Sequence, residues 1–395
     1  MNKKILLVGT SFSAVPLLEK ISNLGYKISV CGGLKNDPCH SYSDNSFYID
    51  YSNKDLLLEL CKKEKFDYLI PTCNDYSYMS CAYVANKLNI MNGFDNYDIS
   101  KLLHTKNSFR EYTLKNNFPV PKAMKVKEYL HTNMIDIPFP LLVKPDDSFS
   151  GMGVTKVEKI EDLSKAINRA IEASRNEEAL IEEFVEGTLH SHSVFIKNGK
   201  INLDFFVDEF CTVYPYQVDS SSLSVLLNEN IKNEVRKSIQ RLISELGLSD
   251  GLLHTQFIVD KNKFWLIETM RRCPGDLYGA LIQKSTGIDY SEYYSFPFLD
   301  RKIDKNVDNL KNKFIIRHTL SSKKKLIFQS FSHAIPSKNV KYFQLKESGQ
   351  ILKEAPFDKI GIVFAEFATL DEIEKYTPIM SKFIEIQSIK GIING

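Results

Sequence analysis

FPLLVKPDDSFSGMGVTKV, residues 139–157, predicts two strands joined by a flexible, glycine-containing loop. An apolar run leads to Lys144, and the chain returns as a strand that ends at Val157. Gly151 and Gly153 allow backbone N–H groups to turn toward an anion, and a lysine fixed on a strand supplies a point charge for a phosphate. The alternative is an ordinary hairpin with a glycine turn and a surface lysine. Other segments have to decide between a polyphosphate site and a plain hairpin.

Two common nucleotide-binding motifs do not fit the glycine-containing turns of this chain. No Gly-Lys-Ser/Thr follows the loop 147–153, and the first turn, Gly9-Thr-Ser-Phe-Ser, has one glycine where a dinucleotide site needs three. The sequence therefore disfavours both a Walker loop and a dinucleotide-binding site.

The composition is that of a globular protein with more than one domain. The chain has 395 residues, of which 43% are hydrophobic and 25% charged, and this predicts two or three closely packed domains. A net charge of +2 gives no general basis for binding nucleic acid or a membrane surface, and no apolar run approaches the roughly 18 residues of a membrane span. Seven scattered cysteines indicate reduced thiols, so we expect a cytoplasmic protein. Whether the protein forms a homodimer stays an open question.

Strand and helix patterns alternate in the N-terminal part of the chain. Apolar strands at 4–8, 27–31 and 68–71 are separated by helical patterns, and this alternation predicts a small parallel sheet with helices on both faces. Asp75 follows the strand 68–71, at the place where such sheets bind ligands. We nevertheless expect Asp75 to cap the next helix.

Two neighbouring strands, 252–258 and 264–270, carry the most informative polar residues. A carboxylate within an apolar strand is costly unless a cation meets it, so Glu268 is a candidate Mg²⁺ ligand with Gln256 as a second oxygen donor. A solvated edge-strand glutamate is the alternative. Because side chains alternate between the two faces of a strand, we expect two rows on these strands. The rows are His254, Gln256 and Ile258 on the first strand, and Leu266, Glu268 and Met270 on the second.

Two arginines, Arg271 and Arg272, follow the second strand at once and precede a Pro-Gly turn with Gly275 and Asp276. Paired arginines can hold a transferring phosphoryl group or an anionic substrate through bidentate hydrogen bonds. Balancing nearby acids on the surface is the alternative.

In their order and spacing these segments resemble the ATP-grasp superfamily of the carboxylate–amine ligase type, and are similar to L-amino acid ligases and to the biotin carboxylase and carbamoyl phosphate synthetase group. The resemblance implies an α/β and α+β fold in three parts. These are an N-terminal parallel α/β pre-ATP-grasp domain at 1–100, an ATP-grasp module of two α+β subdomains at 101–300 with a lid subdomain at 126–187, and a small β-rich domain at 301–395. The motifs that carry the resemblance are Lys106, Phe139 to Gly153, Leu-Ile-Glu182-Glu-Phe-Val-Glu-Gly187, and His254-Thr-Gln256 with Glu268-Thr-Met-Arg-Arg272.

The resemblance also implies which residues bind ATP. The phosphates would lie between two lysines under a closing loop, and the adenine would lie against a hinge strand. The implied residues are Lys106 and Lys144 at the phosphates, Ser150, Gly151 and Gly153 in the lid, Glu182, Glu183 and Val185 on the hinge, and His190 at the ribose.

Catalysis and metal binding follow from the same resemblance. Arg272 and Lys144 would stabilise the phosphoryl transfer, while Gln256 and Glu268 would hold Mg²⁺, or Mn²⁺ in its place. Many relatives carry an asparagine where this chain has Met270, and a thioether does not replace an amide oxygen for a hard cation, so the number of ions stays open. The implied substrate contacts are Arg271, Gly275, Asp276 and His254.

The implied activity is that of an ADP-forming carbon–nitrogen ligase. ATP would phosphorylate a substrate carboxylate to an acyl phosphate, and an amine would displace phosphate to give an amide. The polar and aromatic segment 205–222 is expected to face the cleft and to bind the substrate, which could be an amino acid, a peptide or a sugar acid. Two alternatives stay open: a biotin carboxylase-like enzyme that uses bicarbonate, and an ATP-binding protein without turnover, which Met270 would suggest.

Overall fold

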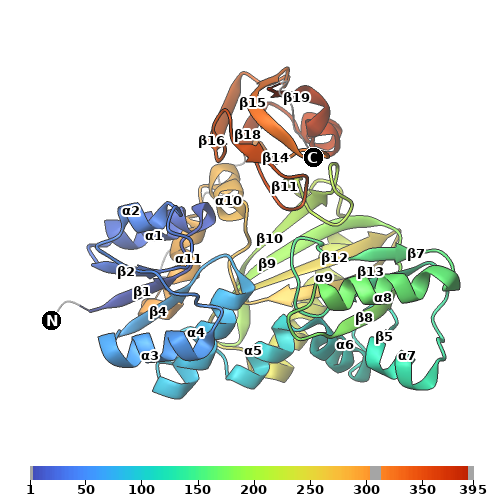
Figure 1. Cartoon of the computed structure of the whole chain (residues 1–395), viewed down its shortest axis with the longest axis horizontal. Coiled ribbons are helices and arrows are strands. Elements are labelled where there is room, and N and C mark those ends of the chain that lie inside the picture. The colour runs from blue at the N-terminus through green and yellow to red at the C-terminus, as the bar shows by residue number, and fades with distance from the viewer. Residues whose placement is uncertain (1–2, 303–312, 390–395) are drawn as a thin grey trace.

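The computed structural model describes residues 3–302 and 313–389, and its N-terminal part is a four-stranded parallel sheet in the order β3-β2-β1-β4. Figure 1 shows α1 and α2 on one side of this sheet and α3 and α4 on the other, which confirms the expected parallel α/β architecture. The strands are β1 (Ile5–Val8), β2 (Ile28–Cys31), β3 (Asn45–Phe47) and β4 (Tyr68–Pro71). The helices are α1 (Val15–Asn23), α2 (Cys39–Tyr42), α3 (Lys54–Glu64) and α4 (Asp75–Leu88).

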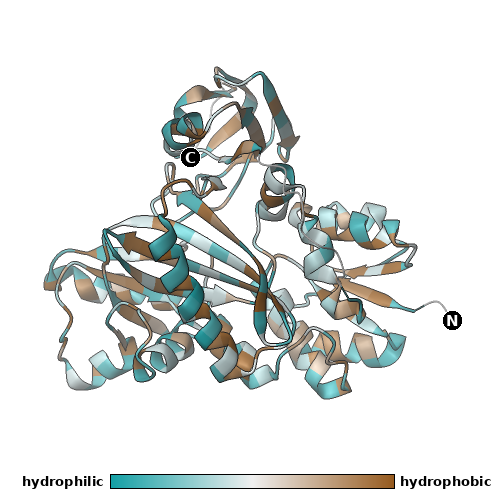
Figure 2. Ribbon diagram, turned by 180° about the vertical axis from the view of Figure 1, so that it is seen from behind, coloured by the Kyte–Doolittle hydropathy of each residue, from teal (hydrophilic) through white to brown (hydrophobic). Residues whose placement is uncertain are grey.

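Burial explains why the central strands of this sheet are continuous apolar runs. Every residue of β1 and β2 is buried, because helices cover both faces of a parallel sheet. Figure 2 shows strands of this sheet, near the N-terminus label, in the hydrophobic colour. The strands β1 and β4 pair side by side in parallel, so the loops that follow them, with Ser11 to Ser13 and Cys73 to Asp75, lie at the same edge. Both loops line the cleft described below.

A second, antiparallel sheet in the order β5-β8-β6-β7 forms the lid region. The helix α8 packs on it through Leu163, Ala166, Ile167 and Ala170, and these side chains form a separate hydrophobic core with the strands. A core of its own allows this region to move as a unit. Its elements are β5 (Ala123–Lys125), α7 (Val126–Thr132), β6 (Leu141–Pro145), β7 (Thr155–Val157), α8 (Leu163–Glu172) and β8 (Ala179–Glu183).

The largest sheet has eight strands in the order β13-β12-β9-β10-β11-β14-β18-β16, and all of its pairs are antiparallel. The helix α9 (Glu229–Leu246) covers one face, where Val235, Ile239 and Leu242 pack against side chains of the strands. The first six strands are β9 (Thr188–Lys197), β10 (Lys200–Phe210), β11 (Ser220–Leu223), β12 (Gly251–Asp260), β13 (Lys263–Met270) and β14 (Phe314–Leu320). The connecting helices are α5 (Tyr97–His104), α6 (Lys106–Lys115), α10 (Tyr278–Thr286) and α11 (Tyr290–Ser295).

The C-terminal part is rich in strands, as expected, and shares the large sheet. The strand β14 pairs with β11, so the eight-stranded sheet continues from residues before 301 into residues after 313. The division into 1–100, 101–300 and 301–395 therefore stays a proposal. In the described part of the chain no helix is long and apolar enough to cross a membrane. The remaining elements are β15 (Leu326–His333), β16 (Asn339–Gln344), β17 (Ile351–Leu352), β18 (Gly361–Phe367), α12 (Leu370–Tyr376) and β19 (Ile384–Ser388).

Candidate active site

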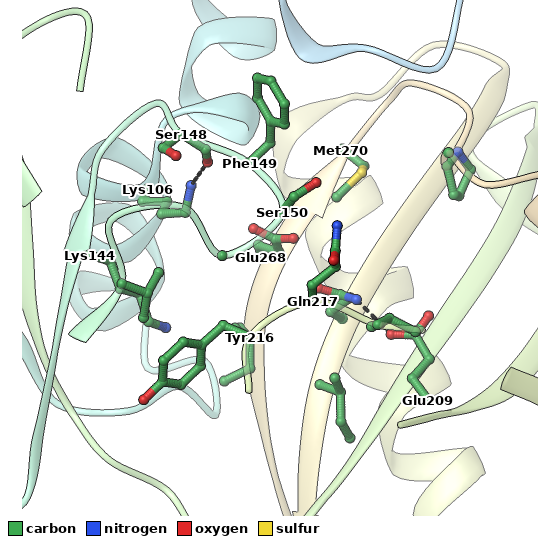
Figure 3. A pocket seen from close by; sticks show the side chains of 18 of the residues that line it. Lys106, Lys144, Ser148, Phe149, Ser150, Glu209, Tyr216, Gln217, Glu268 and Met270 are labelled. Atoms are coloured by element: carbon green, nitrogen blue, oxygen red, sulfur yellow. Dashed lines mark hydrogen bonds between the residues drawn. The ribbon is translucent and has the colours of Figure 1, made fainter. Parts of the chain in front are cut away.

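A cleft of about 800 Å³ opens where the parallel sheet, the lid sheet and the eight-stranded sheet meet. Figure 3 shows Lys106, Lys144 and the lid residues on one side of this space, with Glu268 and Glu209 across from them. Most residues assigned from the sequence line the cleft, whereas Gly153, His190 and Arg271 do not. Those that line it are Lys106, Lys144, Ser150, Gly151, Glu182, Glu183, Val185, His254, Gln256, Glu268, Arg272, Gly275 and Asp276.

Lys144 has a buried counter-ion that the sequence interpretation assigned to adenine. Its ammonium group donates to Glu182 Oε1, and Arg110 donates to Glu182 Oε2 through Nε at 3.0 Å and through Nη2 at 2.6 Å. Burial on its own would raise the pKa of Glu182, but Arg110 and Lys144 hold it below its usual value, so the carboxylate stays ionised. The side chain of Glu182 is therefore part of an ion-pair network, and only the neighbouring Glu183 and Val185 remain candidates for contacts with adenine.

Arg110, which the sequence interpretation left without a role, ties three elements together. It lies on α6, pairs with Glu182 on β8, and donates from Nη1 to the carbonyl oxygen of Leu266 on β13 at 2.9 Å. Its position four residues after Lys106 places both side chains on one face of the helix. That spacing was the available signal in the sequence.

The loop between β6 and β7 is folded down over the cleft and touches both walls. Lys106 donates from Nζ to the carbonyl oxygen of Ser148 at 2.7 Å, and the Tyr76 hydroxyl of α4 donates to the carbonyl oxygen of Asp147 at 3.4 Å. On the opposite wall the Tyr214 hydroxyl donates to the carbonyl oxygen of Gly151 at 3.3 Å. These contacts describe a closed lid, and no carboxylate among the described residues pairs with the Lys106 ammonium group.

Glycine is required at positions 151 and 153 of the lid loop because a Cβ at each position would collide with different neighbours. Gly151 has φ of 70°, and a Cβ there would lie 2.5 Å from Cβ of Tyr216, so the loop could not approach the opposite wall. Gly153 has φ of 76°, and a Cβ there would meet Ala173 at 2.5 Å and Pro145 at 2.7 Å. Gly153 does not line the cleft; it permits close packing of the lid base against Ala173 at the end of α8, and its contact with ATP stays a prediction.

A bulge on β13 corrects the expected row of Leu266, Glu268 and Met270. Gln256 pairs with Glu268 and Phe257 with Leu266, so Ile267 has no partner of its own. Such an extra residue shifts the side-chain alternation, and bulges of this kind re-aim side chains next to active sites. Leu266 consequently packs into the core under α9, while Glu268 and Met270 line the cleft.

Comparison with known proteins supports the family. A model of the ATP-grasp domain matches residues 137–278, the range that holds the lid, both metal-ligand candidates and Arg272. The chain is also 26% identical over 315 residues to the formate-dependent phosphoribosylglycinamide formyltransferase of Prochlorococcus marinus, over 78% of this chain and 79% of that protein. Residues 137–278 form an ATP-grasp domain. The family predicted from the sequence is thereby confirmed.

Solved structures share the fold of nearly the whole chain. An L-amino acid ligase from Bacillus licheniformis matches with a TM-score of 0.80 and 16% identity, over 98% of this chain and 99% of that one. A phosphoribosylglycinamide synthetase from Anaerococcus prevotii matches with a TM-score of 0.75 and 18% identity, over 98% and 100% of the two chains. At these identities the likeness establishes the fold, and the predicted fold class is confirmed.

The donor atoms of Gln256 on β12 and Glu268 on β13 have the chemistry to bind a hard cation such as Mg²⁺. Glu268 makes no ion pair or side-chain hydrogen bond with any described residue, so its carboxylate is free to bind a cation. Gln256 donates from Nε2 to Glu209 Oε2 at 2.6 Å, which leaves its carbonyl oxygen Oε1 as the atom for a cation. Within the described residues no group of three or more His, Cys, Asp and Glu could hold a metal, so the protein supplies few ligands and phosphate and water would complete the shell.

Glu209, a buried residue of β10 that sequence reasoning missed, orients Gln256 in this arrangement. An amide is a useful Mg²⁺ ligand only through its oxygen, and a hydrogen bond from Nε2 to Glu209 fixes which atom points away. We expect Glu209→Gln to weaken Mn²⁺ binding in the presence of ADP by about ten- to a hundredfold. Titration followed by electron paramagnetic resonance measures this, with the exposed Glu347→Gln as control. Equal Mn²⁺ affinity in both variants would remove Glu209 from the metal site.

Two residues assigned to ligands in the ATP-grasp site have structural partners. Arg271 is buried and pairs through Nε with Asp95 Oδ2 at 2.7 Å, while its other nitrogens donate to backbone carbonyl oxygens. Its contacts stabilise the fold, and it does not line the cleft. His190 is also buried, with Nδ1 bonded to Asp208 at 2.8 Å and Nε2 to Thr188 at 2.7 Å. Both ring nitrogens have partners and His190 does not line the cleft, so this conformation gives no support to the predicted contact with ribose.

Asp75 corrects a further expectation, because the cap of α4 is its neighbour. The Asn74 side chain accepts from the backbone N–H groups of Tyr76 and Ser77. The Asp75 carboxylate instead pairs with Arg272 Nη2 at 2.7 Å. The first residue of α4 therefore contacts the arginine that lies two residues after β13.

His254 lines the ATP-grasp cleft as a neutral imidazole. Burial, with help from Arg272 and His192, lowers its pKa to about 3, and its Nδ1 lies 2.7 Å from the Ser193 hydroxyl. Because the pKa of His254 in the folded protein lies below the usual 6.5, folding disfavours the charged ring. The free energy of unfolding is therefore highest above about pH 6.5 and decreases as the pH falls toward 3.

We therefore expect the buried histidine to make unfolding easier in mild acid. At pH 5 the cost is about 2 kcal/mol of unfolding free energy relative to pH 7.5, and His254→Gln should remove that part. Urea unfolding at the two pH values measures it. An identical loss in the wild type and in His254→Gln would contradict the assignment. Asp75 and Glu182, whose pKa values are lowered, do not protonate in this window.

The segment 205–222 faces the cleft as expected, through residues 209–211 and 215–218. Across from it, Asp276 forms an ion pair with Lys359, accepts from Thr319 Oγ1 at 3.1 Å, and offers its carbonyl oxygen to Arg317 at 3.0 Å. Lys359 and Arg317 also line the cleft and come from the C-terminal part, which the sequence had not connected with the site.

Proposed function

We propose that this ATP-grasp ligase phosphorylates the carboxylate of a small molecule with ATP and then joins the acyl group to an amine. The observation that carries the proposal lies at the end of β13. There, Glu268 has an unpaired carboxylate and Arg272 has a buried Nε–H without a partner among the described residues, in one cleft with two lysines beneath a closed lid. Phosphoryl transfer needs positioning and charge neutralisation more than a protein nucleophile, and these groups supply both.

Each part of the cleft has a role in this reaction. Lys106 and Lys144 would bind the ATP phosphates, the backbone next to Glu183 and Val185 would hold adenine, and Gln256 with Glu268 would hold Mg²⁺, which neutralises phosphate charge when bound. The lid would exclude water, so that an acyl phosphate is not hydrolysed.

The two steps balance with the substrates named. A carboxylate oxygen attacks the γ-phosphorus, the bond from that phosphorus to the β–γ bridging oxygen breaks, and ADP leaves with the electron pair. The amine nitrogen then attacks the acyl carbon, the carbon–oxygen bond to phosphate breaks, and the amine releases a proton to solvent or phosphate. Arg272 would stabilise the negative charge that both steps place on the phosphoryl oxygens.

The relatives indicate which substrates to test first. A formate-dependent phosphoribosylglycinamide formyltransferase and an L-amino acid ligase are both similar to this chain. The panel should therefore contain formate, amino acids and sugar acids as carboxylates, each with and without amino acids, peptides and phosphoribosylglycinamide as amines. Bicarbonate without an amine forms a separate arm.

The test is ADP release from Mg²⁺-ATP across this panel, with product identified by mass spectrometry. Release that requires one acid and one amine, together with an amide product, supports the ligase. Release with bicarbonate alone favours the carboxylase-like alternative. Binding of ADP without release in any arm favours the ATP-binding protein without turnover.

A further inference from the structure

Asp75, at the first position of α4, makes two contacts that hold its carboxylate in one orientation. Oδ2 accepts from Arg272 Nη2 at 2.7 Å, and Oδ1 lies 3.0 Å from Nδ1 of His104. Asn74 is the N-cap residue of α4, so both carboxylate oxygens of Asp75 are available for these partners. Asp75, His104 and Arg272 all line the cleft.

The tautomer of the neutral His104 ring follows from the partner of its second nitrogen. Nε2 accepts the backbone N–H of Arg271 at 3.0 Å, so in the neutral ring the proton is on Nδ1 and is donated to Asp75. The ring also stacks on Tyr78 with centroids 4.7 Å apart and planes at 10°. The imidazole is therefore fixed by contacts on its edge and its face, and it fixes Asp75 in turn.

Arg272 is held at two of its three nitrogens. Nη2 is on Asp75, Nη1 donates to the carbonyl oxygen of Cys273 at 3.3 Å, and Nε is buried and has no partner among the described residues. The guanidinium plane is thus set by Asp75. These contacts use two of the five guanidinium N–H groups, so the Nε–H and one N–H on each of Nη1 and Nη2 remain for an anion. A rigid fork of this kind recognises phosphoryl oxygens only when it is correctly oriented.

We propose that Asp75 is a positioning residue that orients Arg272 toward the transferring phosphoryl group, so that the N-terminal sheet helps to build the phosphoryl-transfer site. The proposal rests on the proposed function in one respect, the role of Arg272. Asp75 touches no reacting atom; it acts through the arginine. Burial would raise the pKa of Asp75, yet Arg272 and His104 lower it below its usual value, so the carboxylate is charged at the pH of any assay near neutrality.

The test uses a mimic of the transferring phosphoryl group and needs no knowledge of the substrates. Affinity for Mg²⁺-ADP is measured by calorimetry with and without aluminium fluoride, in the full-length wild type and in Asp75→Asn. We expect aluminium fluoride to tighten binding in the wild type, and Asp75→Asn to lose about ten- to a hundredfold of that gain while its affinity for Mg²⁺-ADP alone is unchanged. If Asp75 had only a structural role, Asp75→Asn would weaken binding of Mg²⁺-ADP equally with and without aluminium fluoride.

Three further variants make the result specific. Asp75→Glu keeps the charge and should fold even where Asp75→Asn does not; it should retain part of the gain. Arg272→Lys should lose the gain by itself, and adding Asp75→Asn should then cost little more, because the two residues act as one unit. Asp95→Asn breaks the matching pair of the adjacent Arg271 and should lower the melting temperature without changing the gain.

The outcomes decide the proposal separately from the ligase activity. The positioning role would be overturned if aluminium fluoride tightened the binding of Mg²⁺-ADP by Asp75→Asn as much as by the wild type. Where Asp75→Asn is unfolded, the same result with Asp75→Glu would overturn it. No gain in the wild type that binds Mg²⁺-ADP would overturn it too, since Arg272 would then not act on the phosphoryl group. Failure of the ligase proposal shows elsewhere, as an absence of ADP release with every acid and amine.

Discussion

Replacing Glu268 with glutamine is expected to lower ADP release by about a thousandfold. Glutamine keeps the shape of the side chain but removes the one unpaired carboxylate on this part of β13. Without that charge the site would rely on the amide oxygens of two glutamines, and a hard cation binds a carboxylate much better than an amide. The charge on the phosphates would then be poorly neutralised in the transition state.

Stability provides an independent readout for the same variant. The Glu268 carboxylate has no ion-pair partner among the described residues, so Glu268→Gln should leave the melting temperature unchanged or raise it. The control is Glu347→Gln, which neutralises an exposed carboxylate outside the cleft and should retain full turnover. Wild-type turnover in Glu268→Gln would remove this residue from the metal site, and lost turnover with a collapsed melting temperature would indicate unfolding instead.

Local patterns in the sequence were sufficient to locate residues that line one cleft, including those to which we assign ATP and Mg²⁺. The strand that ends in Lys144, the glycine loop after it and the polar pair Gln256 and Glu268 each carry their signal within a few residues. Each also depends on a rule that acts locally, such as the alternation of side chains along a strand. That is why the family and the fold class could be predicted before any contact was known.

Contacts between distant segments could not be predicted in the same way. Glu182 meets Lys144 because β8 and β6 are antiparallel neighbours with Leu142 opposite Glu182, and this register is a property of the folded sheet. The glutamate looked like a hinge residue because its immediate neighbours fit the family motif. The bulge at Ile267 moved Leu266 to the opposite face for a similar reason, since one inserted residue changes the alternation without leaving a clear mark in the sequence.

Two polar residues assigned to ligands, His190 and Arg271, do not line the cleft. His190 and Arg271 have the chemistry to bind a ribose or an anion, but their hydrogen-bonding capacity is taken up by Asp208, Asp95 and backbone groups. A sequence gives the type of a side chain and not its partners. The structure distinguishes the two arginines by their position and partners. Arg271 does not line the cleft and its Nε lies 2.7 Å from Asp95 Oδ2, whereas Arg272 lines the cleft and its Nε has neither an ion-pair nor a hydrogen-bond partner among the described residues.

Replacing Arg110 with methionine is expected to lower the free energy of unfolding by about 3–5 kcal/mol, the largest stability effect that we predict. Methionine fills a similar volume but donates no hydrogen bonds. Glu182 would keep only Lys144 as a partner, and the carbonyl oxygens of Leu266 and Ile267 would lose the donors that Arg110 now provides at 2.9 and 3.0 Å. Urea unfolding measures the loss.

The control is a surface arginine with a similar pair. Arg241 donates to Glu245 at 2.7 Å on the exposed side of α9, and Arg241→Met should cost less than about 1 kcal/mol because water screens the pair. If the two variants lost equal free energies of unfolding, burial would not make the Arg110–Glu182 pair more important for stability than the exposed pair.

The double variant Arg110→Met with Glu182→Gln separates the two duties of this network. If the single loss comes from a buried charge left without its partner, then neutralising Glu182 should recover part of the stability, and the two changes should not be additive. Lys144 would still lack its counter-ion, and we expect ADP release to remain impaired because this ammonium group is positioned by Glu182. Recovered stability without recovered turnover would mean that Glu182 serves the fold through Arg110 and the phosphate site through Lys144. Additive losses would instead mean that the two side chains stabilise the protein independently.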